Sequence, residues 1–417
     1  MERVAIIGGT RTPFVRAGGV FSDQSFLDLG THAVKSLIAK LEIQPSAIEE
    51  LIYGTVLLDP RMPNAARELV LRSGLPATIP AHFISNNCIS GLVAINMIAE
   101  GIRSGRISCG VAGGSESMSR PSLSLHPKSE KFFLALARAR TLTQKLKILA
   151  GFRPKYLLPQ PPSPKEPSTG LTMGQHCEIT AKEFAISREV QDRIALASHT
   201  NAAKAQSAGY LAEEITPLGK IDRDNLIRAD TSLERLEKLA PVFDRSPQGT
   251  LTAGNSSALT DGASAVLLMS EKRARQEGRE ILGYLEMTQY AAIAPSDGLL
   301  MAPGLALPKL MQRSNLNVGE IDLFEIHEAF AAQVAANLAV WEQGWQKFPE
   351  LKPIGKIPTE KINVNGGSIA IGHPFAATGG RLVVSLLNQL KRGNQRQGVI
   401  SVCAAGAMAC AMLLRRN

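Results

Sequence analysis

The spacing of apolar residues predicts two long amphipathic helices, one in each half of the chain. Apolar side chains recur three or four positions apart over residues 90–103, and the same spacing returns over residues 378–391. Each segment leads into an apolar run that predicts a buried strand, at 109–112 and at 398–403. Alternating helices and strands predict an α/β protein in which helices cover the faces of sheets.

A second repeated pattern precedes these helices. A helix-like stretch at 33–41 runs into a strand-like stretch ending at 54, and residues 310–316 followed by 318–327 repeat this layout. We therefore predict two related halves, an N-terminal one formed by residues 1–120 and 241–275 and a C-terminal one formed by residues 276–417.

Residues 121–240 lie between the halves and are predicted to form an inserted loop domain. Their proline-rich stretch, 159–167, is incompatible with regular structure. Before it, the pattern over 132–152 predicts one basic amphipathic helix, and after it residues 187–207 predict another helix.

Composition and charge narrow the class of protein. The 417 residues are 44% hydrophobic and 20% charged, as in ordinary globular proteins. The net charge is +9, and nine Lys or Arg against two acidic residues fall between Pro121 and Gly170. This concentration indicates one basic patch on the insertion and no nucleic-acid partner.

Cysteine usage and the start of the chain favour a cytoplasmic protein. The strand-like run 4–7 leaves no room for a signal or transit peptide, so none is expected. The five cysteines lack the spacing of a disulfide framework, which favours a reducing compartment. They contain no CxxC pair either, so we expect no metal site.

Two cysteines and one histidine carry the candidate chemistry. Cys88 stands where a strand would turn into the 90–103 helix, whose N-terminus favours a thiolate and should lower the thiol pKa. His373, between Gly372 and Pro374, could accept the thiol proton. Cys403 could protonate a departing carbanion. Packed cysteines and a core histidine are the structural alternatives.

The motifs around these residues resemble the thiolases almost from end to end. They are Arg11-Thr12-Pro13-Phe14, Asn87-Cys88-Ile89-Ser90-Gly91, Gly113-Gly114-Ser115-Glu116-Ser117-Met118-Ser119, Thr172-Met173-Gly174, Thr252-Ala253-Gly254-Asn255-Ser256-Ser257, His327-Glu328-Ala329-Phe330, Gly372-His373-Pro374 and the Cys403 loop. The resemblance implies a thiolase fold with two βαβαβαββ halves in a five-layered α-β-α-β-α arrangement and an inserted loop domain.

The resemblance also implies catalytic roles. Cys88 would be the nucleophile, and Cys403 the acid and base for the carbanion. His373 would be the base toward Cys88 and then a donor to the thioester oxygen. The backbone N–H groups of Cys88 and Ala405 would form an oxyanion hole. His327 stands where many thiolases have asparagine, as in the β-subunit of the trifunctional fatty-acid oxidation complex and its bacterial counterparts. We expect it to polarise the thioester oxygen, a histidine at a strand end being the alternative.

The resemblance also bears on the residues that would bind coenzyme A and on the loop after Cys403. The resemblance implies Arg228 near the adenine or its phosphate, Ser257 near the pantetheine and Met173 along the acyl group. Arg228 could instead be a solvated residue paired with Asp230. Thiolases usually carry more glycine after the second cysteine, whereas this chain has Ala407 and Ala409, whose methyl groups disfavour positive φ.

The implied activity is coenzyme A-dependent cleavage of 3-ketoacyl-CoA to acetyl-CoA and a shortened acyl-CoA, as in fatty-acid β-oxidation. It proceeds through an acyl-cysteine, without a covalently bound cofactor. The alternatives are an acetoacetyl-CoA thiolase, a ketoacyl synthase, which the second thiol disfavours, and a non-catalytic thiolase-like scaffold subunit.

The expected partners are coenzyme A and acyl-CoA, a second copy in a homodimer or dimer of dimers, and a hydratase/dehydrogenase α-subunit. A basic amphipathic segment at 128–155 also fits peripheral contact with the inner face of a membrane.

Overall fold

The computed structural model describes residues 2–417 as two compact units, one small and one large. The small unit comprises residues 57–63 and 121–164, and the large unit contains the rest of the described chain. The large unit holds the strands β1 (Val4–Arg11), β2 (Val15–Arg16), β3 (Glu50–Gly54), β4 (Ala81–Ile84), β5 (Cys109–Glu116), β8 (Thr260–Ser270), β9 (Gly283–Ala292), β10 (Leu323–Ile326), β11 (Gln397–Ala404) and β12 (Met408–Arg415).

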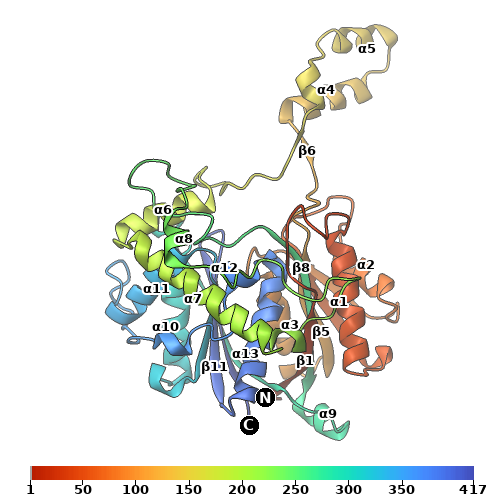
Figure 1. Ribbon diagram of the computed structural model, residues 1–417. Coiled ribbons are helices and arrows are strands. Elements are labelled where there is room, and N and C mark those ends of the chain that lie inside the picture. Colours follow the sequence, from red (N-terminus) through yellow and green to blue (C-terminus); the bar gives the residue numbers. More distant parts are fainter. Residues whose placement is uncertain (1) are drawn as a thin grey trace. The chain divides into compact units, whose positions relative to one another are not determined.

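Eleven α-helices accompany these strands in the described part of the large unit (Figure 1). They are α1 (Phe26–Lys40), α2 (Ala65–Arg72), α3 (Ser90–Arg103), α6 (Met173–Glu183), α7 (Arg188–Ser207), α8 (Leu233–Glu237), α9 (Glu271–Gln276), α10 (Pro303–Ser314), α11 (Ala331–Gln343), α12 (Ser368–Ile371) and α13 (Thr378–Arg392). The helices predicted over 90–103, 187–207 and 378–391 are confirmed by α3, α7 and α13, within one residue at each end.

The strand pairing shows the predicted repeat directly. In the first half β3 pairs with β5 in parallel, β5 with β8 and β8 with β1 in antiparallel fashion. In the second half β10, β11, β12 and β9 pair in the same sequence and with the same directions. A short antiparallel pairing of β1 with β9 joins the two halves into one continuous path.

Helices α3 and α13 form the middle of the large unit. They pack against each other, α3 against β3, β5 and β8, and α13 against strands of both halves. Their apolar faces share one core with strand residues such as Ile52, Val402 and Met412. Helices α1 and α2 pack on the first half, and α10 and α11 border a separate core of the second half (Figure 1). The helix starts at Ser90 and Thr378 thus come from the central layer.

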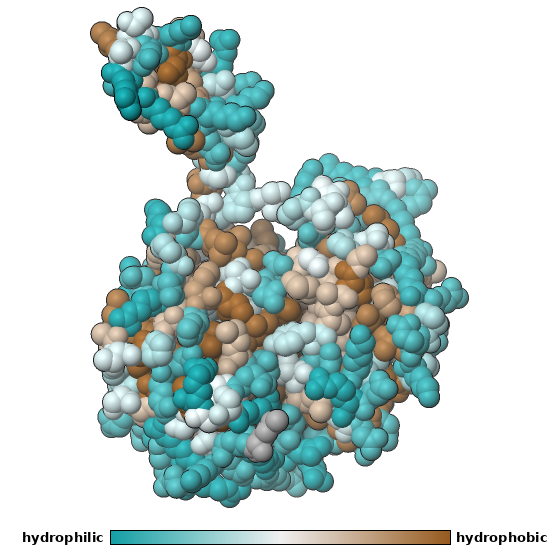
Figure 2. Space-filling view, turned by 180° about the vertical axis from the view of Figure 1, so that it is seen from behind, coloured by the Kyte–Doolittle hydropathy of each residue, from teal (hydrophilic) through white to brown (hydrophobic). Residues whose placement is uncertain are grey.

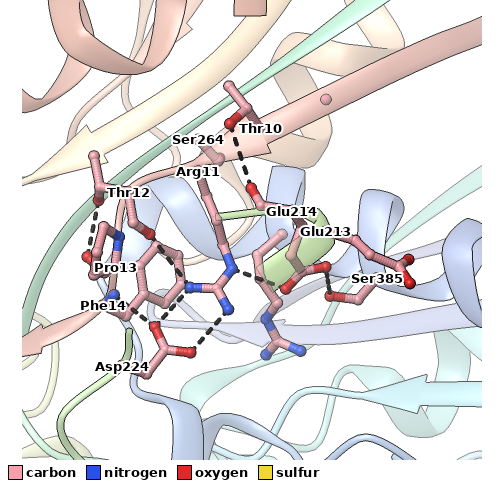
Figure 3. Close-up of polar contacts among 12 residues, drawn as sticks. Thr10, Arg11, Thr12, Pro13, Phe14, Glu213, Glu214, Asp224, Ser264 and Ser385 are labelled. Atoms are coloured by element: carbon pink, nitrogen blue, oxygen red, sulfur yellow. Dashed lines mark hydrogen bonds and ion pairs between the residues drawn. The ribbon is translucent and has the colours of Figure 1, made fainter. Parts of the chain in front are cut away.

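The Arg11-Thr12-Pro13-Phe14 motif has a structural role. Arg11 is 1% exposed, and its guanidinium donates 2.8 Å to Glu214 and 2.6 and 2.8 Å to the two oxygens of Asp224 (Figure 3). Ser385 of α13 donates to the other Glu214 oxygen at 2.6 Å, and the backbone N–H of Phe14 donates to Asp224. The network fastens the 211–225 segment to β1 and α13.

The small unit contains two helices where the sequence predicted one. Helix α4 (Pro127–Arg138) ends before Ala139, whose backbone is extended, and α5 (Leu142–Leu149) starts after Thr141, whose side chain forms a capping box with Gln144. The single helix expected over 132–152 is therefore wrong, because this cap competes with continuation of the helix. Strands β6 (Ser124–Leu125) and β7 (Pro159–Gln160) pair at the ends of the unit.

The small unit is poor in buried residues and rich in charge. Four aromatic rings cluster inside it, Phe132, Phe133, Phe152 and Tyr156. Within 121–164 there are eight basic residues and one acidic residue. Leu134, Leu142, Leu146 and Leu149 are exposed, so apolar and polar residues alternate on its surface, as Figure 2 shows by colour. No helix in residues 2–417 is long and apolar enough to cross a membrane.

Candidate active site

The turn that carries Cys88 is fixed by its own backbone and by Ser90. Asn87 has φ +49°, a left-handed conformation that asparagine tolerates better than most residues. The Ser90 hydroxyl donates to the Asn87 carbonyl and accepts from the Asn86 N–H, both at 2.7 Å. Helix α3 begins at Ser90, as the sequence predicted, so the thiol lies just before a helix N-terminus.

Two glycines let the second half approach this turn. A Cβ atom on Gly91 would lie 2.5 Å from the carbonyl oxygen of Ala376, and one on Gly114 would lie 2.2 Å from the same oxygen. Real Cβ atoms do not come this close, so only glycine fits at both positions. The turn of residues 373–377 can therefore rest on the start of α3 and on β5. Here His373 precedes α13 by five residues, and a single 3-10 turn, Phe375–Ala377, lies between them.

Cys88, His327 and His373 converge at one buried point. The Cys88 sulfur and one nitrogen of each imidazole lie within 4.8 Å of one another. The two histidine rings are 4.0 Å apart between centroids. Nδ1 of His327 lies 2.8 Å from the Ser368 hydroxyl and Nδ1 of His373 lies 2.6 Å from that of Thr378, whereas neither Nε2 has a hydrogen-bond partner in the described chain. Both rings are thus anchored by one nitrogen and offer the other.

The loop after Cys403 completes the site. The backbone N–H groups of Ala405 and of Cys88 itself donate toward the Cys88 sulfur. The Ala405 carbonyl accepts from the Asn87 side chain at 2.9 Å, and the next N–H, that of Gly406, donates to the Glu166 carboxylate at 3.1 Å. These contacts hold the loop against the Cys88 turn, with both predicted oxyanion donors facing the same sulfur.

The loop also shows how the chain accommodates alanine in place of glycine. Ala407 adopts φ +55°, although its methyl group disfavours this conformation by roughly 1–2 kcal/mol. Ala409 lies in β12 with ordinary extended backbone. The expected conflict between an alanine methyl group and a positive φ therefore occurs at Ala407 and not at Ala409. The left-handed residues Asn87 and Ala407 follow the pattern of local strain near functional sites.

Burial dominates the electrostatics of the site. Burial raises the pKa of Cys88 to about 12, although the Ala405 and Cys88 N–H groups act in the opposite direction. The lowered thiol pKa expected from the helix N-terminus is therefore wrong for the resting structure, because the loss of solvation is larger. Burial lowers the pKa of His373 to about 3, and burial, His373 and Arg381 lower the pKa of His327 well below its usual value. The resting site holds a neutral thiol and two neutral imidazoles.

Cys403 belongs to the same electrostatic environment. Its side chain is 1% exposed and packs in a cluster that includes Cys177, Phe330 and Met173. Burial raises its pKa well above the usual value, and negative charge on Cys88 or Cys177 would raise it further. A buried neutral thiol at this place can hold a proton for a strongly basic neighbour.

The three residues assigned to coenzyme A are less closely tied to the site. Met173 borders the Cys403 cluster and is half-buried, as is Ser257, whose backbone N–H donates to Ala329 just beyond His327. Arg228 is exposed, and its backbone N–H donates to His199. The exposed Arg228 fits the alternative of a solvated residue, but its expected partner Asp230 forms its ion pair with Arg235.

Cys88, His327 and His373 are also the one group in residues 2–417 whose donor atoms lie close enough together to hold a metal ion. A thiolate and two imidazoles are ligands that zinc accepts. An ion there would occupy the sulfur lone pair that a nucleophile needs.

Sequence inspection missed the residues that hold the site in place. Ser368 and Thr378 hydrogen-bond to the two imidazoles, and Arg381 to Ser368. Asn87 and Glu166 hydrogen-bond to the backbone of the loop after Cys403. Ser368 and Thr378 stand within five residues of His373, so the richness of the 365–378 segment in small polar residues was the available signal. Nothing in the sequence pattern pointed to Glu166.

Comparisons with known proteins agree with the predicted fold. The thiolase N-terminal domain model matches residues 4–272 and the thiolase C-terminal domain model matches residues 279–416. A 3-ketoacyl-CoA thiolase of Shewanella pealeana is 43% identical, and one of Vibrio cholerae is 41% identical, each covering 99% of this chain and 97% of the relative.

A solved structure, the Bacillus anthracis acetyl-CoA acetyltransferase, superposes with a TM-score of 0.85 at 29% identity. The superposition covers 100% of this chain and 99% of the other. The predicted thiolase fold is therefore confirmed, and the chain belongs to the thiolase family.

Proposed function

We propose that this protein is a 3-ketoacyl-CoA thiolase that cleaves 3-ketoacyl-CoA with coenzyme A through an acyl-Cys88 intermediate. The observation that carries the proposal is the convergence of the Cys88 sulfur and two imidazoles within 4.8 Å, with two backbone N–H groups directed at that sulfur. The names of the relatives at 41–43% identity support the same activity.

In the first step His373 accepts the Cys88 proton at Nε2, and the sulfur forms a bond to the 3-keto carbon. The pair is neutral at rest, so substrate binding and the developing charge must drive this transfer. The negative charge moves to the former keto oxygen, where the N–H groups of Cys88 and Ala405 can donate to it. Preorganised donors of this kind typically contribute a factor of about 10²–10³ each.

In the second step the carbon–carbon bond breaks and its electron pair moves to the acetyl-CoA fragment. His327 and the newly protonated His373 can donate to the thioester oxygen that receives this charge, while Cys403 protonates the carbon. Coenzyme A then gives its thiol proton to the Cys403 thiolate and attacks acyl-Cys88. Acyl-CoA leaves, and the Cys88 sulfur recovers its proton from His373. The scheme is ping-pong.

The replacement Cys88→Ala tests the proposal. We expect thiolysis to fall by several orders of magnitude while coenzyme A binding is retained, because alanine removes the nucleophile without filling or emptying the pocket. Cys109→Ala is the control, since Cys109 is a free thiol in β5 that is fully buried and takes no part in the proposed reaction. Undiminished thiolysis by the Cys88 variant, or equal losses in both variants, would refute the assignment.

We also propose that coenzyme A acts as a substrate and that no covalent cofactor or metal takes part. Arg228 would lie near the adenine or its phosphate, Ser257 near the pantetheine and Met173 along the acyl chain. The contact of Met173 with the Cys403 cluster supports the last assignment. An Arg228→Ala variant should weaken coenzyme A binding, and it should bind dephospho-coenzyme A as well as the unchanged protein does if the guanidinium recognises the phosphate.

Acetoacetyl-CoA cleavage is the second candidate, because the 29% identical solved structure is named an acetyl-CoA acetyltransferase. The two candidates share the site and differ in pocket depth. Turnover measured on short-chain and long-chain 3-ketoacyl-CoA separates them, and we expect the longer chains to be accepted.

A homodimer or dimer of dimers is the assembly we propose, in the cytoplasm. We further propose that residues 128–155 contact the inner face of a membrane or a hydratase/dehydrogenase α-subunit. The exposed leucines of α4 and α5 beside eight basic residues support such a contact.

Flotation with anionic vesicles at low and high salt tests the membrane contact. Replacing Leu146 and Leu149 by serine should abolish flotation, and the same change at Leu71, which is similarly exposed on α2, should not. Failure of the unchanged protein to float at low salt would leave the α-subunit as the expected partner, tested by co-purification.

A further inference from the structure

His327 is connected to a buried chain of polar side chains that ends in a charge. Its Nδ1 lies 2.8 Å from the Ser368 hydroxyl, and Arg381 of α13 donates to the same hydroxyl at 3.0 Å. Arg381 also donates to Glu325 at 3.2 Å, and Gln389 donates to the other Glu325 oxygen at 2.8 Å. His327 and Ser368 are fully buried, and Arg381 and Glu325 are each 1% exposed.

The hydrogen-bond capacity of Ser368 limits how this chain can be protonated. A serine hydroxyl has one hydrogen to donate and two lone pairs to accept with. Arginine can only donate, so Arg381 occupies one lone pair. If His327 donated from Nδ1, it would take the second lone pair, and the serine hydrogen would have no acceptor in the described chain.

The opposite arrangement satisfies the Ser368 hydroxyl completely. Ser368 donates to the Nδ1 lone pair, accepts from Arg381, and leaves no unpaired hydrogen. A donor bond from a cation polarises the hydroxyl and strengthens its own donation. Since a neutral imidazole carries one hydrogen, that hydrogen then resides on Nε2 of His327.

We propose that Arg381, acting through Ser368, holds His327 in the tautomer with hydrogen on Nε2, so that His327 is a permanent hydrogen-bond donor to the substrate thioester oxygen. Ser368 and Arg381 are thus positioning residues. This inference rests on the proposed thiolase activity for the identity of the acceptor, whereas the tautomer itself is a property of the protein alone.

The neighbouring imidazole provides an internal contrast. His373 is anchored by Thr378, whose hydroxyl receives no donor from the described chain apart from the imidazole itself. No cation donates to the Thr378 hydroxyl, so nothing in the described chain polarises it toward donation as Arg381 polarises Ser368, and the tautomer of His373 can change as this histidine takes up and releases a proton. The His327 ring is thus held in one tautomer, whereas the His373 ring can change its tautomer. The two ring centroids are only 4.0 Å apart.

Nitrogen-15 NMR of protein labelled in the histidine rings tests the tautomer without any substrate. The His327 signals are identified by their loss in a His327→Asn variant. We expect the hydrogen on Nε2 in the unchanged protein, a mixture of tautomers in Ser368→Ala, and the Nε2 form again in Ser368→Thr, which keeps the hydroxyl. Hydrogen on Nδ1 in the unchanged protein would overturn the proposal.

A double-mutant cycle tests the consequence for catalysis. Ser368→Ala should lower kcat/KM of thiolysis about 10-fold, at the lower end of the 10–100-fold loss seen when a residue that orients a metal-binding histidine is changed. In a His327→Asn background, where no tautomer exists, the same change should have no further effect. Equal losses in both backgrounds would show that Ser368 does not act through His327. If the unchanged protein lacks thiolysis altogether, the proposed function fails while the NMR result still decides the tautomer.

Discussion

Removing the Arg11 guanidinium should destabilise the protein more than removing any other single charge discussed above. Arg11 neutralises two carboxylates, Glu214 and Asp224, that are 3% exposed or less, through three hydrogen bonds of 2.6–2.8 Å (Figure 3). Breaking a buried pair by deleting one partner costs about 3–5 kcal/mol, because the other charge stays buried. Arg11→Met leaves two such charges, so we expect a loss of at least about 5 kcal/mol, comparable to the whole stability of many domains.

Two arginines serve as graded controls in the same assay. Arg381→Met leaves only Glu325, and burial already raises the pKa of that carboxyl to about 7, so it can take up a proton and the loss should be smaller. Arg235→Met removes a pair whose side chains are both more than 60% exposed, and no measurable change is expected.

Urea unfolding followed by circular dichroism gives the ranking. The order of destabilisation should be Arg11, then Arg381, then Arg235. Adding Glu214→Gln and Asp224→Asn to Arg11→Met should recover more than half of the loss, because the unpaired charges are gone. A triple variant as unstable as the single one would show that lost packing, and not unpaired charge, is responsible.

Two further predictions concern the site itself. Cys403→Ala should lower carbon–carbon cleavage by about 10²–10⁴, the usual contribution of a positioned acid. The same variant should slow formation of acyl-Cys88 from an acyl-CoA much less, because that reaction forms no carbanion. Equal losses in the two assays would contradict the role of Cys403. The pKa of His373 is depressed in the folded state, to about 3, and ordinary histidine has a pKa of about 6.5. Stability from its neutral form is therefore fully present above about pH 6.5 and is lost as pH falls toward 3, by roughly 2 kcal/mol down to about pH 5. His373→Asn should flatten this acid side of the stability curve, and an unchanged slope would argue against a buried neutral imidazole.

The repeated patterns of the sequence predicted the fold because they reflect burial. Helices α3 and α13 are apolar on the faces that enter the central core. The spacing of these apolar residues, three or four positions apart, can therefore be recognised in the sequence alone. The break between α4 and α5 was missed because apolar residues continue across it. The Thr141 and Gln144 capping signal was present but was outweighed by the periodicity.

The reactive groups of the candidate site could be predicted from the sequence. The burial of these groups, which sets their pKa values, could not. Cys88, His373 and Cys403 stand in recognisable turns, and the resemblance to thiolases supplied their pairing. Their pKa values depend on desolvation by residues distant in the sequence, so the helix N-terminus suggested a lowered Cys88 pKa where burial raises it. The Arg381–Ser368–His327 chain joins three elements and could be recognised only once they were placed together.

Peptide mass spectrometry after incubation with a 3-ketoacyl-CoA, in the absence of free coenzyme A, tests the central claim most directly. The convergence of Cys88, His327 and His373, with Cys403 as the proposed proton donor, predicts that acetyl-CoA is released and that the remaining acyl group is found on the peptide containing Cys88. An acyl group on any other cysteine, or acetyl-CoA released without a covalent acyl-enzyme, would contradict it.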